Sequence, residues 1–396
     1  MSEMSYLEKL LDGVEVEWKT LEDITLRTSN IKWREVIRSY RYIDLTSVDI
    51  ATKKITETTE ITKNNAPSRA QKLVDENDVI FATTRPTQQR FCLIDSEYAG
   101  EVASTGYCIL RAKQDQVLPK WILHWISTSD FKKHVEENQS GSAYPAISDS
   151  KVKECLIPIP CPDNPEKSLA IQSEIVRILD KFSELTAELT AELTAELNMR
   201  KKQYNYYRDQ LLNLEGRENT REMRIGDIYD FQYGTGNTIP KSGGQYPVYG
   251  SNGIVGSHDK YNSEDSPVIG HIGAYAGIVN WGQGKHFVTY NGVICRHKSK
   301  EVLQKYAYYL LLLQDFGSKS NSASQPFVSY NILNAPIVLV PPLQEQARIV
   351  AILDKFDALT NSITEGLPRE IELRQKQYEY YRDLLFSFPK PETVSN

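Results

Sequence analysis

The sequence lacks several features that would place it in common classes of protein. No apolar run approaches the roughly 18 residues that a membrane span needs, and the first segment, MSEMSYLEKLLDG, has acidic residues where a secretory signal has basic ones. The 5 cysteines contain no C-x-x-C pair, and the 6 histidines form no group with metal-ligand spacing. We therefore expect a cytoplasmic protein with reduced thiols and no bound metal ion.

Motifs of nucleotide and base chemistry are also missing. The sequence contains no GxxxxGK(S/T) phosphate loop, and the closest approach to an (N/D)PP(Y/F) methyltransferase loop, Asn164-Pro165-Glu166, lacks the second proline and the aromatic residue. The D-x-K triplets at 130–132 and 149–151 are of a kind that occurs by chance in chains of this length, and a nuclease site needs a further placed acid. We expect no catalytic residues and no cofactor bound by this chain.

The charge balance excludes binding to DNA by bulk electrostatics alone. The net charge is -6 at pH 7, whereas phosphate contacts come from clustered Lys and Arg. The excess acid lies mostly in the connecting segments, since residues 217–342 hold 11 Lys and Arg against 9 Asp and Glu. A DNA-binding role therefore requires basic residues gathered on one face, or phosphate contacts from partner subunits.

An internal repeat is the most informative feature of the sequence. ILDKF at 178–182 recurs unchanged at 352–356, and QYNYYRDQLL from 203 recurs as QYEYYRDLLF from 377, both at an offset of 174. YPAIS at 144–148 matches QPFVS at 325–329 at an offset of 181. The chain therefore consists of a variable domain, a helix, a second variable domain and a second helix.

Two long amphipathic helices are predicted at 169–212 and at 343–386. The first segment has no Gly or Pro, and both have apolar residues at three-to-four spacing. Gly366-Leu367-Pro368 should kink or interrupt the second helix. A helix of about 44 residues, roughly 65 Å long, exceeds the diameter of a 140-residue domain, so we favour pairing of the helices over each covering its own domain.

The variable domains have a mixed pattern that indicates an α+β fold. Short β-branched runs such as DVIFATT, YCILR, SPVIG and GVICRH alternate with helical segments such as PKWILHWIS and VLQKYAYYLLLL. The predicted organisation is an N-terminal domain at 1–165, a central helix at 166–215, a second domain at 216–342, and a C-terminal helix and tail at 343–396.

The repeated segments resemble the specificity subunits of type I restriction-modification systems over nearly the whole chain. The resemblance lies in PLQEQARIVAILDKFDALT at 342–360, AIQSEIVRILDKFSELT at 170–186 and the two YYRD helix ends. The three TAEL units at 186–197 further resemble the spacer repeats of one group in that family. The resemblance implies two pseudo-symmetric α/β target-recognition domains, joined by two long antiparallel conserved helices that form a coiled coil.

The resemblance also implies a division of labour among subunits. Each domain would read one half of a bipartite, asymmetric site on double-stranded DNA, and the helices would set the gap between the halves and bind partners. Those partners would be two modification subunits that use S-adenosylmethionine, and two restriction subunits that use ATP and Mg. This chain would direct both methylation and restriction without catalysing either.

Direct readout of bases needs side chains that present paired donors or acceptors, such as Arg, Asn and Gln, and the loops of both domains contain them. The candidate DNA-contacting residues are Lys32, Arg34, Arg85, Gln88, Gln89, Arg90, Ser142, Tyr144, Asn237, Lys241, Tyr249, Asn252, Tyr275, Asn321 and Gln325. For His271 an interior, hydrogen-bonded position is favoured over a base contact. We expect Trp33 and Trp281 in the core or at its rim.

The helices supply candidates for spacing and for partner binding. Leucines recur every four residues in the TAEL units, so their stripe drifts around the helix, which favours a spacer over a dedicated coiled-coil seam. The predicted spacer residues are Thr186, Leu189, Leu193 and Leu197. The predicted partner-binding residues are Tyr206, Tyr207, Arg208, Tyr380, Tyr381 and Arg382. Two alternatives remain open, a stand-alone DNA-binding scaffold and a self-contained nuclease or methyltransferase.

Overall fold

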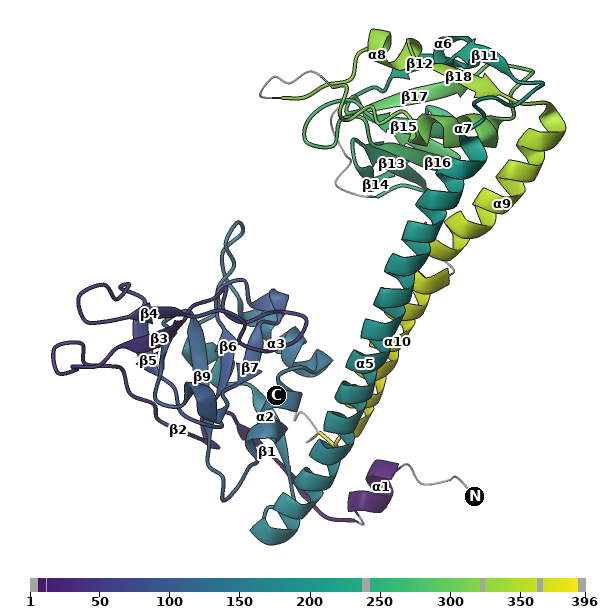
Figure 1. Cartoon of the computed structure of the whole chain (residues 1–396). Helices are drawn as coiled ribbons and strands as arrows, with labels where there is room; N and C mark the ends of the chain where they lie inside the picture. Colours follow the sequence, from purple (N-terminus) through teal and green to yellow (C-terminus); the bar gives the residue numbers. More distant parts are fainter. Residues whose placement is uncertain (1–5, 12, 237–242, 321–324, 362–365, 391–396) are drawn as a thin grey trace. The chain divides into compact units, whose positions relative to one another are not determined.

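The computed structural model describes residues 6–11, 13–236, 243–320, 325–361 and 366–390 (Figure 1). The chain divides into two compact units, the first made of Met1–Ala191 with Glu372–Asn396 and the second of Glu192–Ile371. Each unit therefore contains one variable domain, the adjoining part of one long helix and the far part of the other. We call the variable part of the first unit domain 1 and that of the second unit domain 2.

Unit 1 is an α+β structure with three small sheets. Its strands are β1 (Val16–Thr20), β2 (Thr25–Leu26), β3 (Tyr40–Ile43), β4 (Thr59–Ile61), β5 (Ala70–Leu73), β6 (Val79–Ala82), β7 (Phe91–Leu93), β8 (Val102–Ser104), β9 (Tyr107–Ala112) and β10 (Leu156–Pro160). Its short helices are α1 (Tyr6–Leu11), η1 (Pro86–Gln88), η2 (Ser96–Tyr98), α2 (Pro119–Trp125), α3 (Ser129–Asn138) and α4 (Asp149–Lys153).

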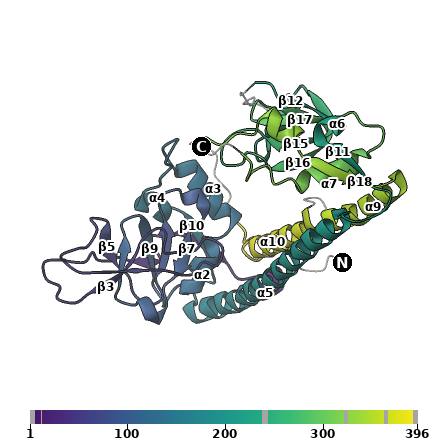
Figure 2. The ribbon, with the colours of Figure 1, turned by 45° about the horizontal axis from the view of Figure 1, so that its top comes forward.

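The sheets of unit 1 follow from its apolar runs. β6 is buried at all four positions, and it pairs with β9 and β7 in the sheet order β2-β9-β6-β7. Helix α2 lies against these strands and contributes Trp121 and Trp125 to the core (Figure 2). The second sheet has the order β4-β3-β8-β5, and β1 pairs with β10. The strands and the helix predicted from DVIFATT, YCILR and PKWILHWIS are confirmed.

Unit 2 has the same kind of architecture around one larger sheet. Its strands are β11 (Arg221–Arg224), β12 (Tyr229–Tyr233), β13 (Tyr246–Gly250), β14 (Gly253–His258), β15 (Ser263–Gly270), β16 (Val279–Val288), β17 (Gly292–His297) and β18 (Ile337–Val340). Its short helices are α6 (Ile225–Ile228), α7 (Gln304–Leu312) and α8 (Tyr330–Asn334). The sheet order is β12-β17-β15-β16-β13-β14, and β11 pairs with β18 as β1 pairs with β10.

The long helices lie where the repeat predicted them. Helix α5 spans Pro165–Leu212, 48 residues, against the predicted 169–212. The second helix is interrupted as predicted, because α9 covers Leu343–Asn361 and α10 covers Gly366–Leu385. Gly366 has φ +77°, and a Cβ there would lie 2.6 Å from the carbonyl oxygen of Ala358, so the break requires glycine. In the described part of the chain no helix is long and apolar enough to cross a membrane.

The two long helices contact each other in both units through equivalent residues. In unit 1 the ring of Phe182 stacks on Tyr381 at 5.8 Å, and in unit 2 the ring of Phe356 stacks on Tyr207 at 5.6 Å. The repeat offset of 174 relates Phe182 to Phe356 and Tyr207 to Tyr381, so the two contacts are equivalent. Since early residues of α5 meet the end of α10 and late residues of α5 meet α9, the contacts run antiparallel.

Each long helix is held on its own domain by a buried glutamine. Gln172 accepts a hydrogen bond from the backbone N–H of Leu118 at 2.9 Å and donates one to the carbonyl of Gln116 at 3.0 Å. Gln346 does the same in unit 2, with Leu303 at 2.8 Å and Glu301 at 3.0 Å. Both glutamine side chains are fully buried, so each bond is protected from water.

The end of each helix closes the core of the other domain. Phe386 and Phe388, which follow α10, pack on Trp121 in unit 1. The equivalent residues after α5, Leu212 and Leu214, are buried in unit 2. Each unit therefore contains the end of a long helix that begins in the other unit, and removing either helix end exposes apolar surface.

Candidate nucleic-acid interface

Each domain contains a junction at which two loop segments are joined by the same backbone hydrogen bonds. In domain 1 the N–H of Ile147 donates to the carbonyl of Thr83 at 2.9 Å, and the N–H of Arg85 donates to the carbonyl of Pro145 at 2.7 Å. Thr84 and Ala146 form the isolated bridge between these bonds. The TTRPTQQR segment and the YPAIS motif are therefore neighbours.

Domain 2 repeats this junction with different side chains. The N–H of Val328 donates to the carbonyl of His271 at 2.9 Å, and the N–H of Gly273 donates to the carbonyl of Pro326 at 2.8 Å. Ile272 and Phe327 form the bridge. The sequence match between YPAIS and QPFVS thus marks one structural site that occurs twice, and the loops that it joins differ between the domains.

In domain 1 the junction exposes a cation beside an aromatic ring. Arg85 lies over the ring of Tyr144 at 5.1 Å from its centroid, and 72 % of Tyr144 is exposed. Ser142 and Gln88 are exposed on the same two loops. Arg85 has φ 49°, a left-handed conformation that costs energy for a residue other than glycine and often marks a functional position. Two predicted contact residues, Arg85 and Tyr144, are thereby brought into contact, and two more lie exposed on the same loops.

The other two candidates of this segment point inward. Arg90 donates to the carbonyl oxygens of Leu45 and Val48, the second at 2.8 Å. The side-chain amide of Gln89 is buried, and among the described residues it has no hydrogen-bond partner. These two residues support the loop from within, so direct contact with a base would require the loop to rearrange.

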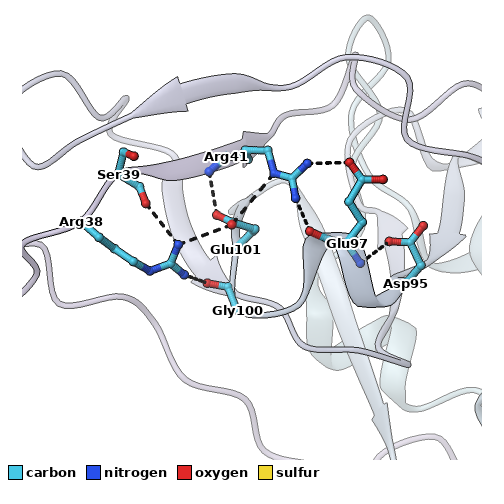
Figure 3. Close-up of polar contacts among 7 residues, drawn as sticks. All are labelled: Arg38, Ser39, Arg41, Asp95, Glu97, Gly100 and Glu101. Atoms are coloured by element: carbon cyan, nitrogen blue, oxygen red, sulfur yellow. Dashed lines mark hydrogen bonds and ion pairs between the residues drawn. The ribbon is translucent and has the colours of Figure 1, made fainter.

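A second basic group of domain 1 is already engaged by carboxylates (Figure 3). Arg41 bonds to the carboxylate of Glu97 at 2.7 Å, and its backbone N–H donates to Glu101. Arg38 donates to the carbonyl of Gly100 at 2.7 Å and lies 3.4 Å from the Glu101 carboxylate. The ion pair with Glu97 raises the pKa of Arg41. These arginines tie β3 to η2 and β8, and a phosphate would have to displace carboxylates to bind them.

Lys32 and Arg34, two further candidates of domain 1, lie at the surface and are far from the junction segments in the sequence. Lys32 is exposed and pairs with Glu35 at 3.5 Å, an arrangement that contributes little stability in water. Arg34 is exposed. Trp33, between them, packs against the core around Ile31 and donates its indole N–H to the carbonyl of Ala70, as expected of a rim aromatic residue.

In domain 2 the exposed candidates lie on three turns. Tyr275 is 49 % exposed on the loop after β15, Asn252 is exposed at the β13–β14 turn, and Gln325 is exposed before the junction. Tyr249 is only 6 % exposed and donates its hydroxyl to the carbonyl of Trp281 at 3.3 Å, so it faces the interior. Asn237, Lys241 and Asn321 lie outside the described residues.

The interior position favoured for His271 is confirmed. Its exposed fraction is 5 %, and its Nδ1 lies 3.1 Å from the carbonyl oxygen of Tyr290. Trp281 is partly buried against the core of unit 2, also as expected. Sequence reasoning missed Tyr233, whose ring stacks on His271 and on Tyr330, a residue 97 positions further along the chain.

The spacer and partner-binding residues lie on the long helices. Thr186, Leu189, Leu193 and Leu197 are half-buried. Tyr206 and Tyr380 are 62 % and 64 % exposed, whereas their neighbours Tyr207 and Tyr381 stack within the helix pair. The guanidinium groups of Arg208 and Arg382 bond to the adjacent Asp209 and Asp383, at 2.8 Å and 2.9 Å.

The residues that could suggest catalysis have structural partners. Asp149 pairs with Lys72, and Asp130 pairs with Lys390 at 2.8 Å. Burial raises the pKa of the Cys92, Cys108 and Cys155 thiols to about 12, which makes them poor nucleophiles. Within the described ranges no group of three or more His, Cys, Asp or Glu could hold a metal ion.

Two similar α+β domains, each with two loops joined by the same backbone hydrogen bonds and each closed by the helix of the other, define a two-domain recognition protein. The comparisons specify its family. The model for the type I restriction modification DNA specificity domain matches residues 15–199 and again residues 217–373. The chain therefore belongs to the family of type I restriction-modification specificity subunits.

Two curated relatives match over nine tenths or more of the chain. The chain is 40 % identical to the EcoR124I/EcoR124II specificity subunit of Escherichia coli, with 100 % of both chains covered. It is 36 % identical to the EcoprrI specificity subunit of Escherichia coli, covering 92 % of this chain and 93 % of the relative.

Solved structures share the fold. A chain from a type I R-M system, solved to describe its assembly and conformational transition, has a TM-score of 0.65 at 22 % identity and covers 94 % of this chain and 97 % of its own length. The HsdS subunit from Thermoanaerobacter tengcongensis has a TM-score of 0.50 at 21 % identity and covers 94 % of this chain and 96 % of its own length.

Proposed function

We propose that the chain selects the DNA target of a type I restriction-modification complex by reading two half-sites, one with each domain. The observation that carries this proposal is the repeated junction, which presents loops of different composition on the same scaffold in both domains. Bidentate hydrogen bonds from side chains to base edges are one physical means by which proteins distinguish bases. Different loops on one scaffold therefore give two different half-sites and an asymmetric target.

In domain 1 we assign base contact first to Arg85, supported by Tyr144, Gln88 and Ser142. Arginine presents two donors that match the O6 and N7 acceptors of guanine. The ring of Tyr144 limits the conformations of the guanidinium group and so lowers the entropy lost on binding. In domain 2 we assign the same role to Tyr275, Asn252 and Gln325, with Asn237, Lys241 and Asn321 retained as candidates from the sequence.

The paired helices are proposed to set the gap between the half-sites and to bind the partners. Exposed aromatic rings beside arginine are common at protein interfaces. Tyr206 and Tyr380 occupy equivalent positions in the repeat, so the chain offers the same surface twice, once in each unit. That duplication fits two modification subunits, which would use S-adenosylmethionine, and two restriction subunits, which would use ATP and Mg, in the cytoplasm.

The test is to map methylated sites in cells that carry the complete system, by single-molecule sequencing. The proposal expects a bipartite motif with two unrelated halves separated by a fixed gap. Arg85→Ala should relax or change one half only, whereas Arg177→Ala, an exposed arginine of α5 paired with Glu174, is the matched control and should leave the motif unchanged. A continuous motif, or a change in both halves, would contradict the proposal.

Two other functions are separated by a second experiment on the purified chain. A stand-alone DNA-binding scaffold would bind its target tightly without partners. A self-contained enzyme would methylate or cleave DNA when given S-adenosylmethionine or a divalent ion. We expect no turnover by the chain alone, and methylation once the modification subunits are added.

A further inference from the structure

Three aromatic rings form a continuous stack at the edge of domain 2. The ring of Tyr233 lies between two others, with its centroid 4.1 Å from that of His271 and 4.2 Å from that of Tyr330. The interplanar angles are 26° and 14°, so both contacts are face to face. The backbone N–H of Tyr233 also donates to the hydroxyl oxygen of Tyr330 at 3.0 Å, which fixes the stack along its length.

Each ring stands where one of the variable loops begins or ends. Tyr233 is the last residue of β12 and precedes the loop that starts at Gly234. His271 follows β15 and opens the loop that carries Tyr275, and Tyr330 begins α8 after the segment that carries Gln325. The loops that carry Tyr275 and Gln325 are therefore tied at their bases to each other and to the end of β12.

Further hydrogen bonds connect the segments around the stack. The Nδ1 atom of His271 lies 3.1 Å from the carbonyl oxygen of Tyr290, and the backbone N–H of Tyr290 donates to the carbonyl of Gly236 at 3.0 Å. Tyr330 remains 37 % exposed, so the stack lies at the rim of the domain and not in its interior. The stacking interaction therefore stabilises the relative placement of the loops more than it stabilises the core.

At the start of α4, which is equivalent to the start of α8, domain 1 has an ion pair in place of the aromatic stack. Asp149 begins α4 directly after the capping residue Ser148, as Tyr330 begins α8 after the capping residue Ser329. The ammonium group of Lys72, on β5, donates to the carboxylate of Asp149 and to the carbonyl of Tyr107. The side chain of Lys72 is 16 % exposed and that of Asp149 is 45 % exposed, so the pair lies at the rim of domain 1 with its lysine mostly buried.

We propose that Tyr233 and Tyr330 are positioning residues that set how strictly domain 2 reads its half-site, and that Lys72 and Asp149 do the same for domain 1. The proposal rests on the proposed function and adds which residues hold the reading loops in register. A base contact discriminates only while its donors stay within hydrogen-bond distance and direction. Loosening the joint between two loops therefore weakens discrimination before it weakens folding.

The experiment maps methylated sites in cells that carry the complete system with single substitutions. Tyr330→Ala removes one end of the stack and should lower discrimination at one or more base pairs of one half-site by about tenfold, the typical cost of a mismatched base pair. The other half-site and the gap should not change. Asp149→Ala should relax the opposite half-site, so each variant serves as the control for the other.

Conservative variants separate positioning from stability. Tyr233→Phe keeps the stack and should keep the wild-type motif, and Tyr330→Phe keeps the ring but removes the hydroxyl acceptor, so its effect should be smaller than that of alanine. Tyr330→Leu keeps an apolar side chain without the planar stack, and it should relax the motif as alanine does.

Three results would overturn the inference. These are an unchanged motif in the alanine variants, equal relaxation of both half-sites, and a uniform loss of methylation with the motif intact, which is the result expected of a purely structural role. If the wild-type system itself gives no bipartite motif, the proposed function fails first, so the two failures are distinguishable.

Discussion

Removing one TAEL unit from α5 changes the length and the phase of the helix by known amounts. Deletion of residues 186–189 shortens an α-helix by about 6 Å and rotates everything beyond it by about 40° relative to one full turn. On DNA one base pair corresponds to about 3.4 Å of rise and about 34° of twist. Translation alone would thus change the gap by nearly two base pairs, and rotation by about one.

Rotation should decide between these values. A domain that faces away from the groove loses its base contacts, whereas a small axial shift can be absorbed by bending the protein or the DNA. The partner of α5 is divided into two helices, α9 and α10, and Gly366 at the start of α10 has a positive φ that favours glycine. Because this partner is not one continuous helix, it can adjust to a shorter α5. We therefore predict a gap shorter by one base pair and half-sites with unchanged letters.

The assay is methylation mapping of the deletion strain beside the wild-type strain. A matched control replaces residues 186–189 with four other helix-forming residues, which keeps the length and should keep the gap. An unchanged gap in the deletion strain would refute the role of α5 as a spacer. A gap shorter by two base pairs would refute the weight given to rotation.

Three further predictions concern stability and assembly. Tyr380→Ala should reduce co-purification of the modification subunit without changing the melting midpoint, whereas Tyr381→Ala, which removes a ring stack of the helix pair, should destabilise the fold by about 0.5–1.5 kcal/mol. Arg111 bonds to both oxygens of the buried Asp78 carboxylate, at 2.7 Å and 2.8 Å. Arg111→Ala leaves that carboxylate without its charged partner and should lower the free energy of unfolding in urea by about 3–5 kcal/mol. A decrease below about 1 kcal/mol would contradict this prediction. Burial lowers the pKa of Lys53 to about 8, so the unfolded chain binds this proton more tightly and stability should rise with pH from about 8 to the ordinary lysine pKa near 10.4. Lys53→Met should remove that rise, so the melting midpoint of the wild type minus that of the variant should become more positive between pH 7.5 and pH 9.5.

The sequence predicts the long helices well because their signals are local. A segment without Gly or Pro and with apolar residues at helical spacing defines α5 to within four residues of its start, and Gly366-Leu367-Pro368 predicts the break before α10. The repeat adds the junction, because YPAIS and QPFVS lie at the same place in both domains. Periodicity and repetition are thus sufficient for the framework.

The site could be predicted only as a set of loops. The sequence pattern predicts Arg85 and Arg90 equally as base-contacting residues. In the structure Arg85 is exposed beside Tyr144, whereas Arg90 donates to backbone carbonyls inside the domain. The stack of Tyr233 on Tyr330 joins residues 97 positions apart, and no local spacing encodes such a contact. Which polar residue faces outward depends on strand register and turn geometry, which are tertiary properties.

The central claim is that each domain reads its own half of the target while the helices fix the gap. The most direct measurement exchanges residues 221–340 for the corresponding block of the Escherichia coli EcoR124I/EcoR124II specificity subunit and maps methylated sites in cells carrying the complete system. The account predicts a hybrid motif in which one half-site changes to that of the relative, while the other half-site and the gap stay as they are. A motif in which both halves change, or one with no division into halves, would contradict it.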